Sequence, residues 1–185
     1  MREEVTALLE NRNELLTITY FKIQELFDKK YGENALVLME IGTFFEVYEV
    51  NNEKEKIGKA KEIAELLNIQ LTRKNKSILE NSKENPIMAG VPAISFEKHL
   101  ARIIAEQKYT IAIIRQKGTP PNVSRYLDVI VSPGTNFDFV VEQDDNFITS
   151  IVIDQVRGNY LIGYSAIDVT TAKCYYNEVF GTNED

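Results

Sequence analysis

The sequence predicts an α/β fold with a mixed central sheet flanked by helices, followed by a smaller antiparallel meander. Up to about residue 118, strand-like apolar runs alternate with stretches of helical periodicity. A Gly-, Thr- and Pro-containing segment at residues 118–122 then separates this part from strand patterns that follow one another without helices. We therefore expect a first domain at 1–118, a linker at 119–125 and a second, partial domain at 126–185.

The N-terminal third of the sequence predicts one long helix and two strands. The helix is expected from about residue 3 to residue 30, with Gly32 as its C-cap. The continuous apolar run at 35–39 is typical of a buried strand, and after Gly42 the β-branched and aromatic stretch 44–50 predicts a second strand. The apolar stripe of the helix consists of Leu16, Tyr20, Ile23 and Phe27.

The middle of the chain continues the alternation of helices and strands. A helical stripe is expected over 57–68, a short strand over 69–73 and an exposed polar loop over 74–85. Residues 86–92 predict a strand that enters a turn. Ser95 is then a candidate N-cap for a helix with Phe96, Leu100, Ile103 and Ile104 on its apolar face, and a buried strand follows at 109–115.

The C-terminal third predicts strands only. A strand at 126–131 is followed by three more, with the tight-turn sequence 157–159 between the first two of these. A meander of three strands has a face to cover and no helix to cover it, so we expect this chain to be a piece of a longer protein. The three strands of the meander are expected at 147–155, 160–168 and 173–179, a pattern like the opening strands of ribonuclease-H-like folds.

Composition excludes several classes of protein. A hydrophobic content of 44% with 26% charged residues is typical of a folded globular chain. The longest apolar runs, such as 111–114, are too short to cross a membrane, and residues 1–4 are acidic where a secretory signal would be basic. The single cysteine, Cys174, and the single histidine, His99, argue against an internal disulfide, a zinc site and a histidine-based triad. We expect a cytoplasmic protein.

The net charge of −7 conceals a strong asymmetry along the chain. Residues 54–118 carry 13 basic and 7 acidic side chains, whereas both flanking parts are acidic. Such a distribution favours a local anion-binding face, although lysines on solvated helix surfaces would give the same count. Within the polar loop, Arg73, Lys74 and Lys76, with Lys83 nearby, are candidates for contacts with phosphate groups.

The segment around Gly42 carries the most informative pattern. On a strand, Phe44, Glu46 and Tyr48 share one face while Phe45 and Val47 share the other, so both faces carry an aromatic ring. One ring can enter the core, and the other must be covered or serve as a contact. A planar ring two residues from a carboxylate can unstack a base step and hydrogen-bond to the displaced base, but the same pattern also fits a core phenylalanine beside a solvated glutamate.

Four stretches, in order, resemble the MutS family of DNA mismatch repair proteins. The stretch 39–46 (MEIGTFFE) resembles its mismatch-recognition motif of glycine, phenylalanine, any residue and glutamate. The stretches 66–73 (LLNIQLTR), 86–92 (PIMAGVP) and 129–135 (VIVSPGT) resemble three further landmarks at compatible spacing. The sequence departs from the family at Thr43, where aspartate is usual, and at Ala93 and Ile94, where the family commonly has an aromatic residue and histidine.

The resemblance implies a function for each part of the chain. Phe44 is implied to stack on a mispaired base from the minor groove and Glu46 to hydrogen-bond to that base. Residues 1–118 would be the mismatch-recognition domain and 126–185 the start of a connector domain that offers a site for a repair partner. The full-length protein is implied to be a dimeric ATPase that needs ATP and Mg²⁺, whereas this chain lacks the phosphate-loop pattern and is expected to hold no cofactor and to bind mismatched double-stranded DNA without catalysis.

Two alternatives come from other classes of protein. Asp154 and Asp168 fall on neighbouring strands of the meander, as the metal-holding carboxylates of a ribonuclease-H-like nuclease would. The acidic C-terminal part would instead suit a protein-interaction scaffold that docks a repair partner. Cleavage of DNA dependent on a divalent metal would favour the first alternative, and partner binding without any DNA effect would favour the second.

Overall fold

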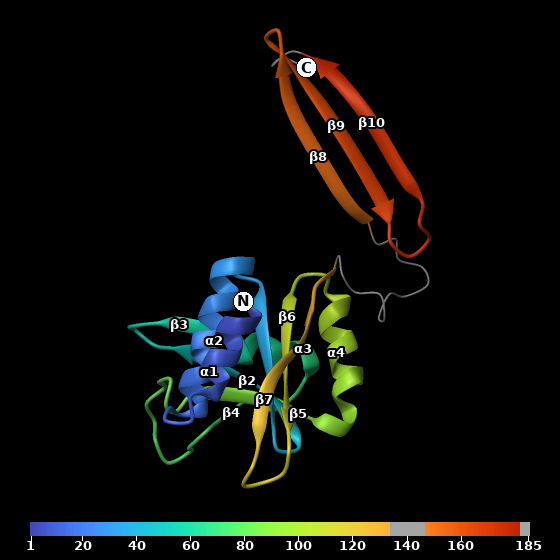
Figure 1. The fold of residues 1–185 in the computed structure, drawn as a ribbon. Helices are drawn as coiled ribbons and strands as arrows, with labels where there is room; N and C mark the ends of the chain where they lie inside the picture. The colour runs from blue at the N-terminus through green and yellow to red at the C-terminus, as the bar shows by residue number, and fades with distance from the viewer. Residues whose placement is uncertain (134–146, 182–185) are drawn as a thin grey trace. The chain divides into compact units, whose positions relative to one another are not determined.

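The computed structural model describes residues 1–133 and 147–181 and divides into two compact units, Met1–Ser132 and Pro133–Asp185 (Figure 1). Each unit is described by itself. Gly134 and Thr135, the end of the 129–135 landmark, lie outside the described residues.

The first unit is built on a seven-stranded mixed sheet, as the sequence predicts. The strands follow the order β4-β5-β2-β1-β6-β7, and β3 pairs with β2 beside this path. β1 and β6 run parallel, while the other paired strands are antiparallel. The strands are β1 (Ala35–Ile41), β2 (Phe44–Asn51), β3 (Lys56–Gly58), β4 (Thr72–Arg73), β5 (Ile87–Pro92), β6 (Thr110–Lys117) and β7 (Ser124–Val131).

Helices cover both faces of this sheet (Figure 1). On one face, Tyr20 of α2 lies edge-on against Tyr48 of β2, with ring centroids 4.8 Å apart, and donates a hydrogen bond of 2.9 Å to the carbonyl of Val37. On the other face, Phe45 of β2 stacks on Phe96 of α4 at a centroid distance of 3.6 Å. The helices are α1 (Arg2–Glu10), α2 (Leu16–Tyr31), α3 (Ala60–Leu67) and α4 (Phe96–Ala105), with a short 3₁₀ turn η1 (Ala93–Ser95) before α4.

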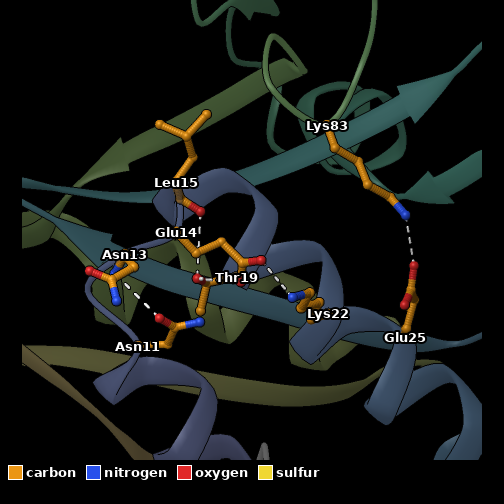
Figure 2. Close-up of polar contacts among 8 residues, drawn as sticks. All are labelled: Asn11, Asn13, Glu14, Leu15, Thr19, Lys22, Glu25 and Lys83. Carbon is orange, nitrogen blue, oxygen red and sulfur yellow. Dashed lines mark hydrogen bonds and ion pairs between the residues drawn. The ribbon is translucent and has the colours of Figure 1, made fainter.

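The single N-terminal helix expected over 3–30 is wrong, because the structure has two helices with a turn between them. Within that turn the backbone N–H of Asn13 donates to the side-chain oxygen of Asn11 over 3.3 Å, as Figure 2 shows. Glu14 forms an ion pair of 2.5 Å with Lys22 in the next helix. Asparagine side chains bind nearby backbone groups and so compete with helical hydrogen bonds, which explains a break at this point.

The structure places the boundary between its two units later than residue 118. The segment 119–125, expected as a linker, is instead the connection between β6 and β7 and the start of β7 itself, which pairs with β6 along its length. Leu127 of β7 is buried in the core of the first unit, and Arg2 of α1 donates to its carbonyl over 3.2 Å. The turn-forming residues therefore connect the two strands of a hairpin, and β7 belongs to the first unit because it pairs with β6.

The second unit contains the expected antiparallel meander, in the order β10-β9-β8. Side chains that alternate between the two faces of β8, such as Val152 and Ile153, are both about two-thirds exposed. Among the described residues of this unit there is no helix to cover either face. The strands are β8 (Phe147–Val156), β9 (Asn159–Asp168) and β10 (Cys174–Gly181).

Across the described residues, no helix combines the length and the apolar character that a membrane crossing requires.

Candidate nucleic-acid interface

The β1–β2 hairpin presents Phe44 at one end of the first unit's sheet. Ile41 pairs with Phe44, so the turn consists of two residues, and Gly42 has a φ of 62°. A positive φ at the first turn position is what a tight β-hairpin requires, and glycine adopts it without a steric penalty. The turn chemistry thus places Phe44 as the first residue of β2.

A glutamine from a distant strand holds the hairpin turn. The side chain of Gln116, at the end of β6, accepts from the N–H of Gly42 over 3.0 Å and donates to the carbonyl of Gly42 over 2.9 Å. The carbonyl of Thr43 accepts from the N–H of Ala93 over 2.8 Å. Both turn residues are therefore tied to neighbouring segments, and the tip of the hairpin is fixed.

The two adjacent phenylalanines have opposite environments. Phe45 is 1% exposed, stacks on Phe96 and has the guanidinium of Arg115 5.4 Å from its ring centroid. Phe44 points to the other face and is 44% exposed. The structure thus resolves the question that strand alternation left open, because one ring enters the core and the other remains available for contact.

Glu46 lies two residues further along the same face, in a partly covered position. Its Oε2 accepts a short hydrogen bond from the hydroxyl of Tyr48 and lies 3.5 Å from the Nζ of Lys74. Lys74 also lies 3.2 Å from the Tyr48 hydroxyl. No partner contacts Oε1 of Glu46 among the residues that the structure describes. One oxygen of the carboxylate is therefore held while the other remains able to accept a hydrogen bond.

Burial and charge keep Tyr48 in its donor form. Desolvation of the buried ring raises the pKa of Tyr48 well above its ordinary value, and the negative charge and hydrogen bond of Glu46 raise that pKa further. The phenol therefore stays protonated and donates to Glu46 throughout the physiological pH range. Gly90 faces Glu46 across the β2–β5 pair, and a Cβ at this position would make its tightest contact, 3.2 Å, with the backbone carbonyl of Phe45.

The basic residues selected from the sequence separate into different roles. The guanidinium of Arg73 donates to the carbonyl of Leu79 and so supports the loop after β4. Lys74 lies against Glu46 and Tyr48, as described above. Lys83 bridges Glu25 at 2.8 Å, seen in Figure 2, and Glu55 at 3.0 Å. Lys76 is exposed and forms no ion pair within the described residues, which leaves it the least engaged of the four.

The loop over 74–85 is more ordered than a solvated polar segment. Asn85 is only 4% exposed, and its side-chain nitrogen donates to the carbonyls of Ile78 and Glu80 over 3.0 and 3.1 Å. Its side-chain oxygen accepts from the N–H of Asn75 over 2.7 Å. A buried asparagine thus closes the loop from inside, whereas sequence reasoning treated Asn85 only as the end of a polar stretch.

Three contributors to this end of the sheet were missed from the sequence. Gln116 binds a glycine 74 positions away, and Arg125 of β7 donates to the carbonyl of Glu40 over 3.1 Å. Ile94 in η1 is 99% exposed. No local pattern could have identified Gln116 or Arg125, since both act on partners in other strands, but an aliphatic residue between small residues just before an N-cap was a visible signal for Ile94.

The structure does not bring Asp154 and Asp168 together. Asp168 pairs with Phe147 at one end of the β8–β9 ladder, while Asp154 lies seven residues further along β8, on the order of 20 Å away. Asp168 is buried and binds the hydroxyls of Thr170 and Thr171 in the turn before β10. The two metal ions of such a site lie about 3.5–4 Å apart, too close to be bridged by carboxylates on the order of 20 Å from each other, so Asp154 and Asp168 do not form the nuclease site considered above. No cluster of three metal-ligating side chains occurs among the described residues.

Comparisons with known proteins assign the chain to a family. A family model described as MutS domain I matches residues 20–140. A DNA mismatch repair mutS homologue of Acanthamoeba polyphaga mimivirus is 28% identical over 95% of this chain. The DNA mismatch repair proteins MutS of Halothermothrix orenii and Chlorobium phaeobacteroides are 28% and 30% identical, each over 81% of the chain. In each case the match spans 16% of the relative's length. Since the family model covers more than half of the sequence and includes the Phe44 hairpin, the chain belongs to the MutS family.

Proposed function

We propose that this chain is the mismatched-DNA-binding module of a DNA mismatch repair protein and that Phe44 is its probe. One observation carries the proposal: a phenylalanine that is 44% exposed stands at the start of β2, on a hairpin turn whose backbone is bonded by Gln116 and Ala93. An aromatic ring held exposed on a fixed support can bury its apolar face against a planar partner. A base stack provides such a partner.

The physical basis for selection is the cost of opening that stack. Insertion of an apolar side chain from the minor groove unstacks a base step and kinks the duplex, at a cost of roughly a few kcal/mol per step. The cost is smaller where base pairing is already defective. Phe44 would therefore enter a mispaired step more readily than an intact one, and the preference arises from the deformability of the DNA.

Glu46 is proposed to hydrogen-bond to the base that Phe44 contacts. Its Oε1 is available for this bond, while Tyr48 and Lys74 hold Oε2. A carboxylate near phosphates also weakens binding to normal duplexes, which favours discrimination. Replacement of Glu46 by glutamine should retain or raise the general affinity for DNA.

We propose that Lys76, and to a lesser extent Arg73 and Lys74, contact DNA phosphates. Such contacts would add affinity that does not depend on the DNA sequence. We propose that the affinity of this chain alone is weak, roughly 10⁻⁴ to 10⁻⁶ M, the range of non-specific DNA binding. ATP, Mg²⁺, dimerisation and any repair partner are proposed for the full-length protein, and no catalytic role is proposed for the residues described here.

A binding titration tests the proposal. The wild-type chain, Phe44→Ala and Glu46→Gln would be titrated against duplexes that are identical except for one mismatched pair, with fluorescence anisotropy as the readout. Phe147→Ala is the matched control, because Phe147 is similarly exposed, at 41%, but belongs to the second unit. The proposal requires that Phe44→Ala lose the preference for mismatched DNA and that Phe147→Ala retain it. Equal mismatch-to-match ratios in the wild type and Phe44→Ala would refute it.

The scaffold alternative retains one supporting observation. Apolar side chains such as Ile151, Val152 and Val179 are more than half exposed on the meander of the second unit. If protein binding through this sheet were the main function, substitution of Phe44 would leave DNA affinity unchanged, whereas substitution of Ile151 by aspartate would abolish binding of a purified repair partner. The same variants therefore separate the two functions.

A further inference from the structure

Ile94 is the most exposed large hydrophobic side chain among the described residues, at 99%. It lies in the 3₁₀ turn η1, between Ala93 and Ser95. Complete exposure of an isoleucine forgoes about 2 kcal/mol of burial energy. A side chain of this kind on a well-defined turn, rather than in a long loop, presents apolar surface that a partner can bury.

The turn that carries Ile94 is attached to the hairpin that carries Phe44. The N–H of Ala93 donates to the carbonyl of Thr43 over 2.8 Å, and Pro92 pairs with Phe44 in the β2–β5 ladder. The hydroxyl of Ser95 donates to the carbonyl of Pro92 over 3.2 Å and tightens the turn. Phe44 follows Thr43 and Ile94 follows Ala93, so each lies one residue beyond the hydrogen bond that joins Ala93 to Thr43. Standard backbone dimensions therefore limit the separation of the Cα atoms of Phe44 and Ile94 to about 11 Å.

We propose that Ile94 is a second apolar DNA contact, which enters the same minor groove as Phe44 within about three base pairs of it. This inference rests on the proposed function, in which Phe44 approaches DNA from that groove. Base pairs are spaced by about 3.4 Å along the duplex, so a separation of up to about 11 Å corresponds to roughly three steps. Isoleucine belongs to the side chains that serve as apolar wedges in minor-groove binding.

The charges around Ile94 favour a polyanion over an apolar protein surface as its partner. Lys98 in the first turn of α4 and Lys117 at the end of β6, next to Gln116, are both exposed. Neither forms an ion pair with a carboxylate in the described part of the chain. The acidic residue of the first turn of α4, Glu97, forms an ion pair of 3.1 Å with Arg115, which offsets its charge. Pro92, which pairs with Phe44 and precedes Ile94 by two residues, is also exposed. Exposed apolar side chains together with unpaired lysines suit a groove walled by phosphates better than they suit a broad hydrophobic interface.

The proposed contact differs from that of Phe44 in what it recognises. Because it lies beside the probed step and not at it, Ile94 meets sugars and base edges of normally paired DNA in this proposal. It therefore stabilises the complex with matched and mismatched duplexes by the same factor. Phe44 sets the ratio of the two affinities, and Ile94 raises both.

The test uses the 185-residue chain and the same two duplexes, at low ionic strength so that weak binding is measurable. Ile94→Ala is compared with Leu79→Ala, which removes a similarly exposed aliphatic side chain, at 87%, from the loop that Asn85 closes. We expect Ile94→Ala to weaken binding to both duplexes by about five- to tenfold without changing their ratio, and Leu79→Ala to bind like the wild type. Thermal melting of each variant verifies that the fold is retained.

The outcomes for Ile94 and for Phe44 are read separately. If Ile94→Ala binds both duplexes as tightly as the wild type, the inference about Ile94 is overturned, whatever Phe44→Ala does. If Ile94→Ala changes the mismatch-to-match ratio, Ile94 acts on the mispaired step and the proposed placement is overturned. If Ile94→Ala weakens both complexes equally while Phe44→Ala retains the mismatch preference, the DNA contact of Ile94 is supported and the function proposed for Phe44 fails.

Discussion

The ammonium group of Lys74 lies 3.5 Å from the carboxylate of Glu46, across 28 positions of sequence. This contact places a positive charge beside the residue that is proposed to read the displaced base. It also means that Lys74 offsets the repulsion between Glu46 and DNA phosphates.

Removal of Lys74 should therefore act through Glu46. We expect Lys74→Ala to weaken binding to both matched and mismatched duplexes by about threefold, because an exposed ion pair contributes roughly 0.2 to 1 kcal/mol and its loss removes a positive charge beside the carboxylate. In the Glu46→Gln background the same substitution should have a smaller effect. Anisotropy titrations of the four proteins form a double-mutant cycle. Additive effects would show that the two side chains are not coupled, and Lys76→Ala serves as the control for simple loss of charge.

Substitution of the two adjacent phenylalanines should separate binding from stability. Phe45 is buried against Phe96, so Phe45→Ala should lower the free energy of unfolding by about 3 to 5 kcal/mol. Phe44→Ala should change it by no more than about 0.5 kcal/mol, because a surface side chain contributes little to the core. Urea denaturation followed by circular dichroism measures both values. A large destabilisation by Phe44→Ala would contradict the assignment of this ring to binding.

The two hydrogen bonds between Gln116 and Gly42 should protect the hairpin turn. In Gln116→Ala the amide proton of Gly42 loses its acceptor, so we expect its exchange with solvent to accelerate by at least about tenfold, as local opening becomes easier. Amide exchange measured by nuclear magnetic resonance provides the rate. Global stability should change by about 1 kcal/mol or less. We also expect a reduced mismatch preference, because a loosened turn no longer holds Phe44 in place; an unchanged preference would show that the bonds to Gln116 do not matter for selection.

His99 should contribute a pH dependence to stability. Burial, together with the positive charges of Arg102 and Lys98, lowers the pKa of His99 below its ordinary value, and its Nδ1 is buried without a hydrogen-bond partner among the described residues. The unfolded chain therefore binds the proton more readily than the folded chain, so stability falls as the pH drops below about 6.5 and the loss levels off below the folded pKa.

Because His99 is the only histidine, its share of this effect can be isolated. Urea denaturation of the wild type and His99→Asn between pH 7.5 and pH 5.5 should show a steeper decline for the wild type. The position of the His99 ring signals in nuclear magnetic resonance spectra gives the folded pKa directly. Parallel declines in the two proteins would contradict the prediction.

Local patterns predicted much of this fold, and non-local contacts account for what they missed. Alternation along 44–50 placed Phe44, Glu46 and Tyr48 on one face, and the pairing of β2 confirms it. Alternation could not decide which aromatic ring is buried, since that depends on Phe96 of α4. The pairing of β7 with β6 and the break between α1 and α2 were missed for related reasons, because strand partners and competing side-chain hydrogen bonds do not show in hydrophobic periodicity.

The candidate site, too, was predicted in part by local patterns and depends in part on non-local contacts. Phe44 and Glu46 were selected from a short motif and lie at the end of the sheet, and their role in mismatch recognition stays a prediction. The basic residues near 73–83 were selected by charge alone, and charge does not reveal that Lys83 bridges two carboxylates or that Lys74 lies against Glu46. Charge counts therefore locate a basic region but do not say which side chains remain available to a ligand.

The hydrogen bonds between Gln116 and Gly42 have a consequence for whether the protein or the DNA changes conformation on binding. β6 is an interior strand that runs parallel to β1, so a force on the hairpin is passed into the middle of the sheet. In the proposed complex the DNA deforms, because a mispaired step opens at lower cost than an intact one. The hairpin then keeps its conformation, and the local deformability of the double helix determines where on the DNA the protein binds.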